Sequence, residues 1–245
     1  MRRFLVTGAS RGIGRAVAEA VISSGASLLA SARNSDALAE LSADRVDVFA
    51  ADLTSAEDRL ALLESCHELD HVVLCAGVAM HEEVRGLQED TLRSTFELNF
   101  FAQALLARDL IPRIRPGGSI TFVSSTLAQR AARSTAAYAA SKAALESFTR
   151  TMALELAPEI RVNAVAPGLV DTDMARALRL QPGEAVPTDE ERKRREAEQQ
   201  KFMNSMHPLG RMGRPTEVAE LILQVSQSAW MTGSIVTLDG GLSLA

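Results

Sequence analysis

The stretch Arg3-Phe-Leu-Val-Thr7-Gly8-Ala-Ser10-Arg-Gly12-Ile-Gly14 decides the fold. Residues 3–7 form an apolar run of strand length, and Ile13, Val17 and Val21 recur at helical spacing before Gly25 ends the helix. The glycines between strand and helix let the backbone turn tightly and approach a bound group closely. A phosphate would then face the N-terminus of the helix. The stretch predicts a strand, a phosphate-binding turn and a helix.

The same alternation of strand and helix continues along the chain. Further strand-like runs occupy residues 27–32, 45–50, 71–76, 119–124, 161–165 and 234–238, with helical stretches between them. The 245 residues are 47% hydrophobic, and no change of composition marks a linker. We therefore expect an α/β fold over residues 1–245: a single-domain, doubly wound, Rossmann-like parallel sheet with helices on both faces.

Composition argues against several other classes of protein. A net charge of −5 gives no basic field that would attract nucleic acid or a membrane surface. The apolar run near the start stops at Gly8, too soon for an export segment, and no apolar stretch could span a bilayer. We expect a cytoplasmic protein without a metal site, because the cysteines and histidines show no ligand spacing: Cys66, Cys75, His67, His71, His81 and His207.

A second informative stretch runs from Ser125 to Lys142. Residues 136–157 contain no glycine and no proline, so Tyr138 and Lys142 should lie on one face of a helix. A nearby ammonium favours the phenolate and should lower the pKa of the tyrosine from about 10. Ser125 ends a strand-like run and could bond the oxygen that Tyr138 protonates. A Tyr-x-x-x-Lys pair alone is more often a solvated helix face, so its weight comes from the glycine turn that accompanies it.

The glycine turn, Ser125 and the Tyr138-x-x-x-Lys142 pair together resemble the short-chain dehydrogenase/reductase family, over residues 3–241. Within it, the 3-oxoacyl-carrier-protein reductases and the small carbonyl or sugar reductases look most similar. The resemblance implies that Tyr138 is the general acid in reduction and that Lys142 also holds ribose hydroxyls. It implies that Ser125 stabilises the developing oxyanion and that Asn99 holds a water that relays protons. Asn99 could instead cap a neighbouring backbone group.

The resemblance also implies a nicotinamide cofactor. Asp52 would bond the adenine amino group, although such a residue could equally cap a turn. The family usually has Asn-Asn-Ala-Gly where this chain has Leu74-Cys75-Ala76-Gly77, so the usual side-chain bracing of that strand is absent. The implied cofactor-binding residues are Gly8, Ser10, Arg11, Gly12, Ile13, Gly14, Arg33, Asp52, Leu53, Ala76, Gly77, Tyr138, Lys142, Pro167, Gly168, Val170 and Thr172.

The end of the second strand favours NADP(H) over NAD(H). An NAD site places a carboxylate there for the ribose 2′-hydroxyl, but the matching residue is Ala32. Arg33 follows, and a guanidinium can bind a 2′-phosphate with two charge-assisted hydrogen bonds. Arg11 is a second cation within reach. Arg33 could otherwise be an exposed surface cation.

Residues 173–210 are the expected substrate lid. Their middle, residues 189–201, reads as a charged helix with a solvated outer face. Met174, Leu178, Phe202, Met203 and Met206 give the lid an apolar underside, and we expect Met174, Met203 and Met206 to contact substrate. The loop from Thr126 to Ala137 should line another wall of the pocket, with Gln129 as a polar contact.

We therefore expect an NADP(H)-dependent ketoreductase of the 3-oxoacyl type that acts on a small carbonyl or alcohol substrate. A sugar or hydroxysteroid dehydrogenase is the alternative within the family, and a non-catalytic cofactor-binding regulator is the alternative of another class. The apolar positions of helix 136–157 suggest a homo-oligomer, tetramer or dimer, although they could pack within one subunit: Leu145, Phe148, Met152 and Leu156.

Overall fold

The computed structural model describes residues 2–41, 43–177 and 187–244. Its centre is a seven-stranded sheet in the order β3-β2-β1-β4-β5-β6-β7, in which every neighbouring pair is parallel. The predicted α/β class and doubly wound sheet are confirmed. The strands are β1 (Arg3–Thr7), β2 (Ser27–Ala32), β3 (Val46–Ala50), β4 (Leu69–Leu74), β5 (Ile114–Val123), β6 (Ile160–Pro167) and β7 (Ile235–Leu238).

Side chains alternate between the two faces of this sheet and supply two separate cores. In β1, Phe4 and Val6 join the core on one face and Leu5 joins the core on the other. Successive side chains of a strand point in opposite directions, so a strand covered on both faces must be apolar throughout. This explains why the predicted strands read as continuous apolar runs.

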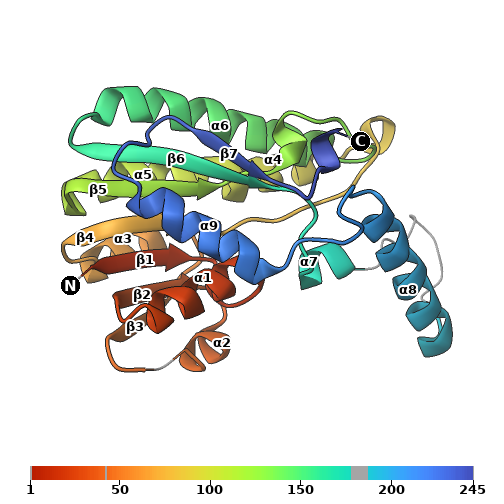
Figure 1. The fold of residues 1–245 in the computed structure, drawn as a ribbon, viewed down its shortest axis with the longest axis horizontal. Coiled ribbons are helices and arrows are strands. Elements are labelled where there is room, and N and C mark those ends of the chain that lie inside the picture. The colour runs from red at the N-terminus through yellow and green to blue at the C-terminus, as the bar shows by residue number, and fades with distance from the viewer. Residues whose placement is uncertain (1, 42, 178–186, 245) are drawn as a thin grey trace.

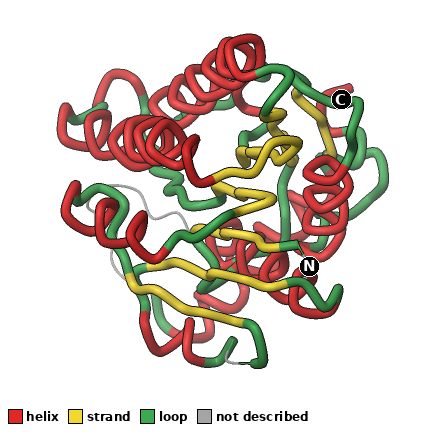
Figure 2. The backbone as a smooth tube through the Cα atoms, turned by 90° about the vertical axis from the view of Figure 1, so that its left-hand side faces the viewer, coloured by secondary structure: helices red, strands yellow, loops and turns green. Residues whose placement is uncertain are grey.

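Helices cover both faces of the sheet (Figures 1 and 2). One layer contains α1 (Gly12–Ser23) and α9 (Pro215–Gln227), which pack against each other and against the central strands. The other contains α3 (Ala56–Ser65), α4 (Glu89–Phe96), α5 (Gln103–Leu110) and α6 (Ala136–Leu156). The short α2 (Ser35–Ala39) packs near the edge, on β2 and β3.

Leu92, Phe96, Asn99, Gln103, Leu106 and Leu110 recur at helical spacing, which predicts one stripe of a long regular helix. The structure interrupts that helix. A π-helical segment, Glu97–Ala102, separates α4 from α5. Such a segment locally replaces the i→i−4 hydrogen-bond pattern and often marks a functional site. Asn99 lies inside it and is fully buried.

The expected lid region contains two helices, α7 (Asp173–Arg176) and α8 (Asp189–Ser205). Thr188 and Glu191 form a reciprocal capping box that fixes the start of α8. Figure 1 shows α8 projecting at one end of the molecule, beside α7. Residues 178–186 of the predicted lid, Leu178 among them, lie outside the described residues.

The apolar positions of α6 pack within the subunit. Leu145 and Met152 belong to the core under α6, and Phe148 meets the rings of Phe100 and Phe122 edge-on. These positions therefore pack within the subunit, with Phe148 and Leu156 partly buried, which is the alternative reading of the pattern, and the oligomer stays a prediction. No helix in the described ranges is long and apolar enough to cross a membrane.

Candidate active site

One cleft of about 790 Å³ lies at the carboxyl ends of the strands. The order of the sheet reverses between β1 and β4, and ligands of open α/β sheets bind at such a switch point. The turns after β1 and β4 both line the cleft, as do the end of β5, the start of α6 and the turn after β6. The cleft brings together every predicted site residue except Asn99 and Gln129.

The glycine turn has the geometry of a phosphate cradle. Gly8 and Gly12 have φ of +69° and +57°, values that disfavour residues with a side chain. A Cβ built on Gly14 would lie 2.2 Å from the carbonyl oxygen of Gly8, so only glycine lets α1 start this close to the turn. Arg11 at the N-cap makes no side-chain capping hydrogen bond. The first N–H groups of α1 can therefore meet the pyrophosphate of a nicotinamide dinucleotide.

Ser125, Tyr138 and Lys142 meet at the end of β5 and in the first turns of α6. Tyr138 hydrogen-bonds with Ser125, whose Oγ also accepts the N–H of Leu127 at 3.2 Å. Lys142 is buried, its Nζ donates to the carbonyl oxygen of Val123 at 2.8 Å, and the same Nζ lies 5.9 Å from the centroid of the Tyr138 ring. The arrangement holds one phenol, one hydroxyl and one amine at a single wall of the cleft.

The charge states at this wall differ from those expected. Burial raises the pKa of Tyr138, and the hydrogen bond with Ser125 acts against that rise. Burial also lowers the pKa of Lys142, to about 8. The prediction that the pKa of Tyr138 lies below its usual value of about 10 is wrong, because the loss of hydration dominates. At neutral pH Tyr138 therefore keeps its proton, as a general acid must.

Asn99 lies behind the wall of the cleft. Its Oδ1 accepts the N–H of Val78 at 2.9 Å, and its Nδ2 donates to the carbonyl oxygen of Val78 at 2.9 Å and to Ser141 Oγ at 3.1 Å. A Cβ on Gly77 would lie 3.1 Å from Asn99 Oδ1 and 3.6 Å from Lys142 Nζ. The Asn99 side chain thus binds the backbone of Val78 and positions the segment after β4, as expected if Asn99 caps a neighbouring backbone group. The proton relay stays a prediction.

Two residues that the sequence analysis did not select brace the segment after β4. Thr7 Oγ1 accepts the N–H of Cys75 at 3.1 Å, and Gln103 Nε2 donates to the carbonyl oxygens of Ala76 at 3.0 Å and Asn99 at 2.9 Å. They supply bracing that the missing asparagines would otherwise provide. Burial raises the pKa of Cys75 to about 12, so its thiol stays protonated. Gln103 could have been found from the sequence, because it stands among apolar residues of helical spacing and a buried side-chain amide must find hydrogen-bond partners.

The adenine side of the cleft carries cations. Ala32 ends β2 without a carboxylate, and Arg33 and Arg11 line the cleft. Neither arginine forms an ion pair with any residue that the structure describes. Asp52 Oδ1 accepts the N–H of Thr54 at 3.0 Å and its hydroxyl at 2.8 Å. These hydrogen bonds lower the pKa of Asp52, with Arg33 contributing, so Asp52 both caps a turn and lines the cleft.

The turn after β6 closes the opposite side of the cofactor cleft. Gly168 lies so near Asp239 that a Cβ would meet the Asp239 side chain at 2.8 Å. Val170 pairs with Gly213 in an isolated parallel bridge, which fixes the course of the turn. A Cβ on Gly12 would lie 3.3 Å from Thr172 Cγ2, so this turn contacts the glycine turn across the switch point.

The lid supplies part of the remaining wall. Met174, Met203 and Met206 line the cleft, and Met203 is buried. Gln129 does not line it, because its Nε2 donates to the buried Glu146 Oε2 at 2.8 Å. The prediction that Gln129 contacts substrate is therefore not supported. The predicted loop and lid also supply Leu127, Arg130, Arg133 and Phe202 to the wall of the cleft, whereas His81 and Gln199 line it without a motif that singled them out.

Comparisons with known proteins agree with this geometry. Residues 8–243 match the family model described as "Enoyl-(Acyl carrier protein) reductase". The chain is 33% identical to D-erythrulose reductase of Gallus gallus, over 98% of this chain and 95% of that protein. It is 34% identical to human L-xylulose reductase, over 98% and 96%.

Solved structures show the same likeness over the whole chain. A short-chain dehydrogenase family protein of Francisella tularensis superposes with a TM-score of 0.89 at 29% identity, covering 100% of both chains. Aldohexose dehydrogenase of Thermoplasma acidophilum superposes with a TM-score of 0.87 at 27% identity, covering 100% of this chain and 94% of that one. The chain therefore belongs to the short-chain dehydrogenase/reductase family, as an oxidoreductase that acts on a carbonyl or alcohol group with a nicotinamide cofactor.

Proposed function

We propose that this protein is an NADP(H)-dependent ketoreductase in which Tyr138, Ser125 and Lys142 act on the substrate oxygen. The observation that carries the proposal is the hydrogen-bonded Tyr138–Ser125 pair, with Lys142 beside it, at the wall of the cleft that also contains the glycine turn. A cofactor-binding regulator without turnover would not require this group.

The chemistry follows from these positions. A nicotinamide cofactor held in this cleft would provide the hydride for the carbonyl carbon. Tyr138 holds its proton at neutral pH and transfers it to the substrate oxygen as negative charge develops there. Ser125 Oγ accepts the N–H of Leu127 and hydrogen-bonds with Tyr138, which holds the Ser125 hydroxyl beside the phenol, where it can stabilise the same oxygen. The ammonium form of Lys142 stabilises the phenolate that remains.

The cofactor proposal rests on the missing carboxylate at Ala32 and on the cations beside it. Arg33 and Arg11 line the cleft, and among the described residues neither forms a direct ion pair, although Arg33 lies near enough to Asp52 to lower the pKa of that carboxylate. A 2′-phosphate would supply the opposite charge there. The remaining predicted contacts to the cofactor are part of the same proposal.

Two substrate types remain in the proposal. The sequence resemblance favours a 3-oxoacyl thioester, whereas relatives named D-erythrulose reductase and L-xylulose reductase favour a small keto sugar. Both present a ketone to the same wall of the cleft. The lid, residues 173–210, would close over the substrate with Met174, Met203 and Met206 facing it.

The test is the Tyr138→Phe variant, which removes the proton donor and keeps the ring. We expect kcat to fall by about 10²-fold or more, with little change in the Kd for the reduced cofactor. Turnover of a panel of ketones is followed by loss of cofactor absorbance. Near-normal kcat in the variant would refute the assigned role of Tyr138, and cofactor binding without turnover of any ketone by the unmodified protein would favour the regulator.

We also propose a homo-oligomer, dimer or tetramer, in the cytoplasm. Phe101 and Leu154 are 48% and 82% exposed, and burying them against a second copy would stabilise an assembly. Cys66 and Cys75 are free thiols, which suits a reducing compartment. Sedimentation of the purified protein measures the assembly, and a monomer at micromolar concentration would contradict it.

A further inference from the structure

The substrate side of the cleft contains a second pair of cations. Arg130 and Arg133 lie in the loop between Ser125 and Tyr138, and both line the cleft. Most arginines of the described residues are paired with acids or carbonyl groups, as Arg176 is with Asp171 and Arg211 with Glu217. Within the described ranges, neither Arg130 nor Arg133 forms an ion pair.

The loop that carries the two arginines is anchored at several points. Gln129 binds Glu146, which is 3% exposed and also accepts the hydroxyl of Ser124 at 3.0 Å. At the other end, the carbonyl oxygen of Ser134 accepts the N–H of Glu82 at 3.0 Å. Ser134 has φ of 61°, so the backbone turns sharply directly after Arg133. The two cations are thus presented by a fixed loop.

This loop begins and ends at the reacting groups. Arg130 lies five residues after Ser125, and Arg133 lies five residues before Tyr138. Five extended residues span at most about 18 Å, so both arginines have Cα atoms within that distance of the reaction centre. The other cationic pair, Arg11 and Arg33, lies with the glycine turn and the ends of β2 and β3. A bound cofactor occupies that side and leaves Arg130 and Arg133 for the substrate.

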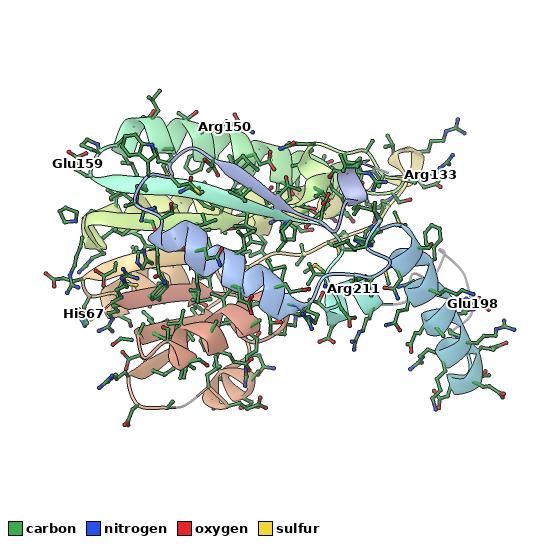
Figure 3. All side chains as sticks on the ribbon, viewed as in Figure 1. His67, Arg133, Arg150, Glu159, Glu198 and Arg211 are labelled. Carbon is green, nitrogen blue, oxygen red and sulfur yellow. The ribbon has the colours of Figure 1, made fainter. Side chains whose placement is uncertain are left out.

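The nearby acidic groups do not neutralise the pair. Glu82 accepts the N–H of Gln88 and the hydroxyl of Thr91, and Glu146 is held by Gln129 and Ser124. Figure 3 shows Arg133 at the same end of the molecule as α8, whose Glu198 points away from the body of the protein. Asp173, at the start of α7, also lines the cleft, and among the described residues no ion pair joins it to Arg130 or Arg133.

We propose that the substrate is a ketone that carries an anionic group, a carboxylate or a phosphate, and that Arg130 and Arg133 bind this group. The inference rests on the proposed ketoreductase function and narrows its substrate class. A guanidinium presents paired N–H donors that match both anions, which a neutral polar side chain does not. Arg130 is partly buried and Arg133 is exposed, so Arg130 should contribute the larger share.

Binding is measured without turnover. The protein is saturated with reduced cofactor, which occupies the Arg11 and Arg33 side, and is titrated calorimetrically with succinate, with glycerol 3-phosphate and with neutral glycerol. We expect the anions to bind more tightly than glycerol, and the Arg130→Gln/Arg133→Gln double variant to lose about tenfold or more of anion affinity. Succinate and glycerol 3-phosphate distinguish a carboxylate from a phosphate preference. Arg85→Gln is the matched control, because Arg85 is exposed on the η1 turn (Val84–Gly86) and does not line the cleft.

Turnover supplies the second readout. Two anionic ketones are each compared with a neutral counterpart: dihydroxyacetone phosphate with dihydroxyacetone, and acetoacetate with ethyl acetoacetate. In the unmodified protein, kcat/KM should be higher for the anionic ketone than for its neutral counterpart in at least one of these pairs. That preference should shrink about tenfold in the double variant and persist in Arg85→Gln. Equal anion affinity in the unmodified protein and the double variant would overturn the inference, even if neutral ketones are reduced. Anion binding that needs Arg130 and Arg133, without turnover of any ketone, would support the anion site and count against the ketoreductase proposal.

Discussion

Arg33→Gln should weaken the preference for NADPH over NADH. A charge-assisted hydrogen bond contributes about 1.5–3 kcal/mol, and screening at an exposed side chain such as Arg33 reduces this to about 1–1.5 kcal/mol. At about 1.4 kcal/mol per tenfold change, the ratio of kcat/KM for the two cofactors should fall by about tenfold. Arg11→Gln should produce a smaller fall, because Arg11 stands in the glycine turn, where the pyrophosphate also attracts it.

Ala32→Asp tests the same site from the opposite direction. Ala32 is 9% exposed at the end of β2, where a carboxylate would bond a ribose 2′-hydroxyl and repel a 2′-phosphate. We expect kcat/KM for NADPH to fall and that for NADH to rise, so that the preference moves towards NADH.

The assay is initial-rate kinetics with both reduced cofactors at a fixed concentration of one ketone. Ala32→Ser is the control, since it adds a polar atom of similar size without charge and should leave the ratio nearly unchanged. Equal kcat/KM values for the two cofactors in the unmodified protein would show that Arg33 does not read the phosphate. An unchanged ratio in Arg33→Gln would do the same.

Burial lowers the pKa of Lys142 to about 8, so the ammonium form is lost as pH rises through 8, and kcat/KM for the reduced cofactor should decline with it. The Lys142→Arg variant stays charged and should not show that decline. Burial lowers the pKa of His71 to about 4, so the folded state binds fewer protons than the unfolded state between pH 4 and 6.5. The free energy of unfolding should therefore fall by about 2–3 kcal/mol in total as pH drops through this window. Urea titrations at several pH values measure this fall, which should be smaller in the His71→Asn variant. Met203→Gln should change KM and ketone preference while the melting temperature stays within a few degrees, and unchanged preference would place the substrate elsewhere.

The sequence was sufficient for the elements whose causes are local. The apolar run of β1 and the glycine turn depend on residues within about 12 positions, and the structure places both where the pattern predicts. The Tyr138–Lys142 spacing likewise fixes two side chains on one helix face whatever surrounds it. The strand runs β1, β2 and β7 have bounds within one residue of the prediction.

Contacts between segments that are distant in the sequence could not be predicted from local sequence patterns. Gln129 and Arg130 are neighbours in one loop, yet Gln129 turns to the buried Glu146 and Arg130 lines the cleft. The apolar face of α6 indicated an oligomer, but Phe148 packs against Phe100 and Phe122 within the subunit. In each case the deciding partner lies on another element, which a local pattern cannot identify.

The pKa values of Tyr138 and Lys142 show most clearly what local sequence determines and what tertiary packing determines. The sequence determined that a phenol and an amine share one helix face, and therefore that acid–base chemistry is available. Only the tertiary structure decided their charge states, because the sheet and loop packed around them remove water from both. That loss of hydration raises the pKa of Tyr138 and lowers that of Lys142. Local spacing sets which groups meet, whereas burial by distant segments sets the energy of each charge.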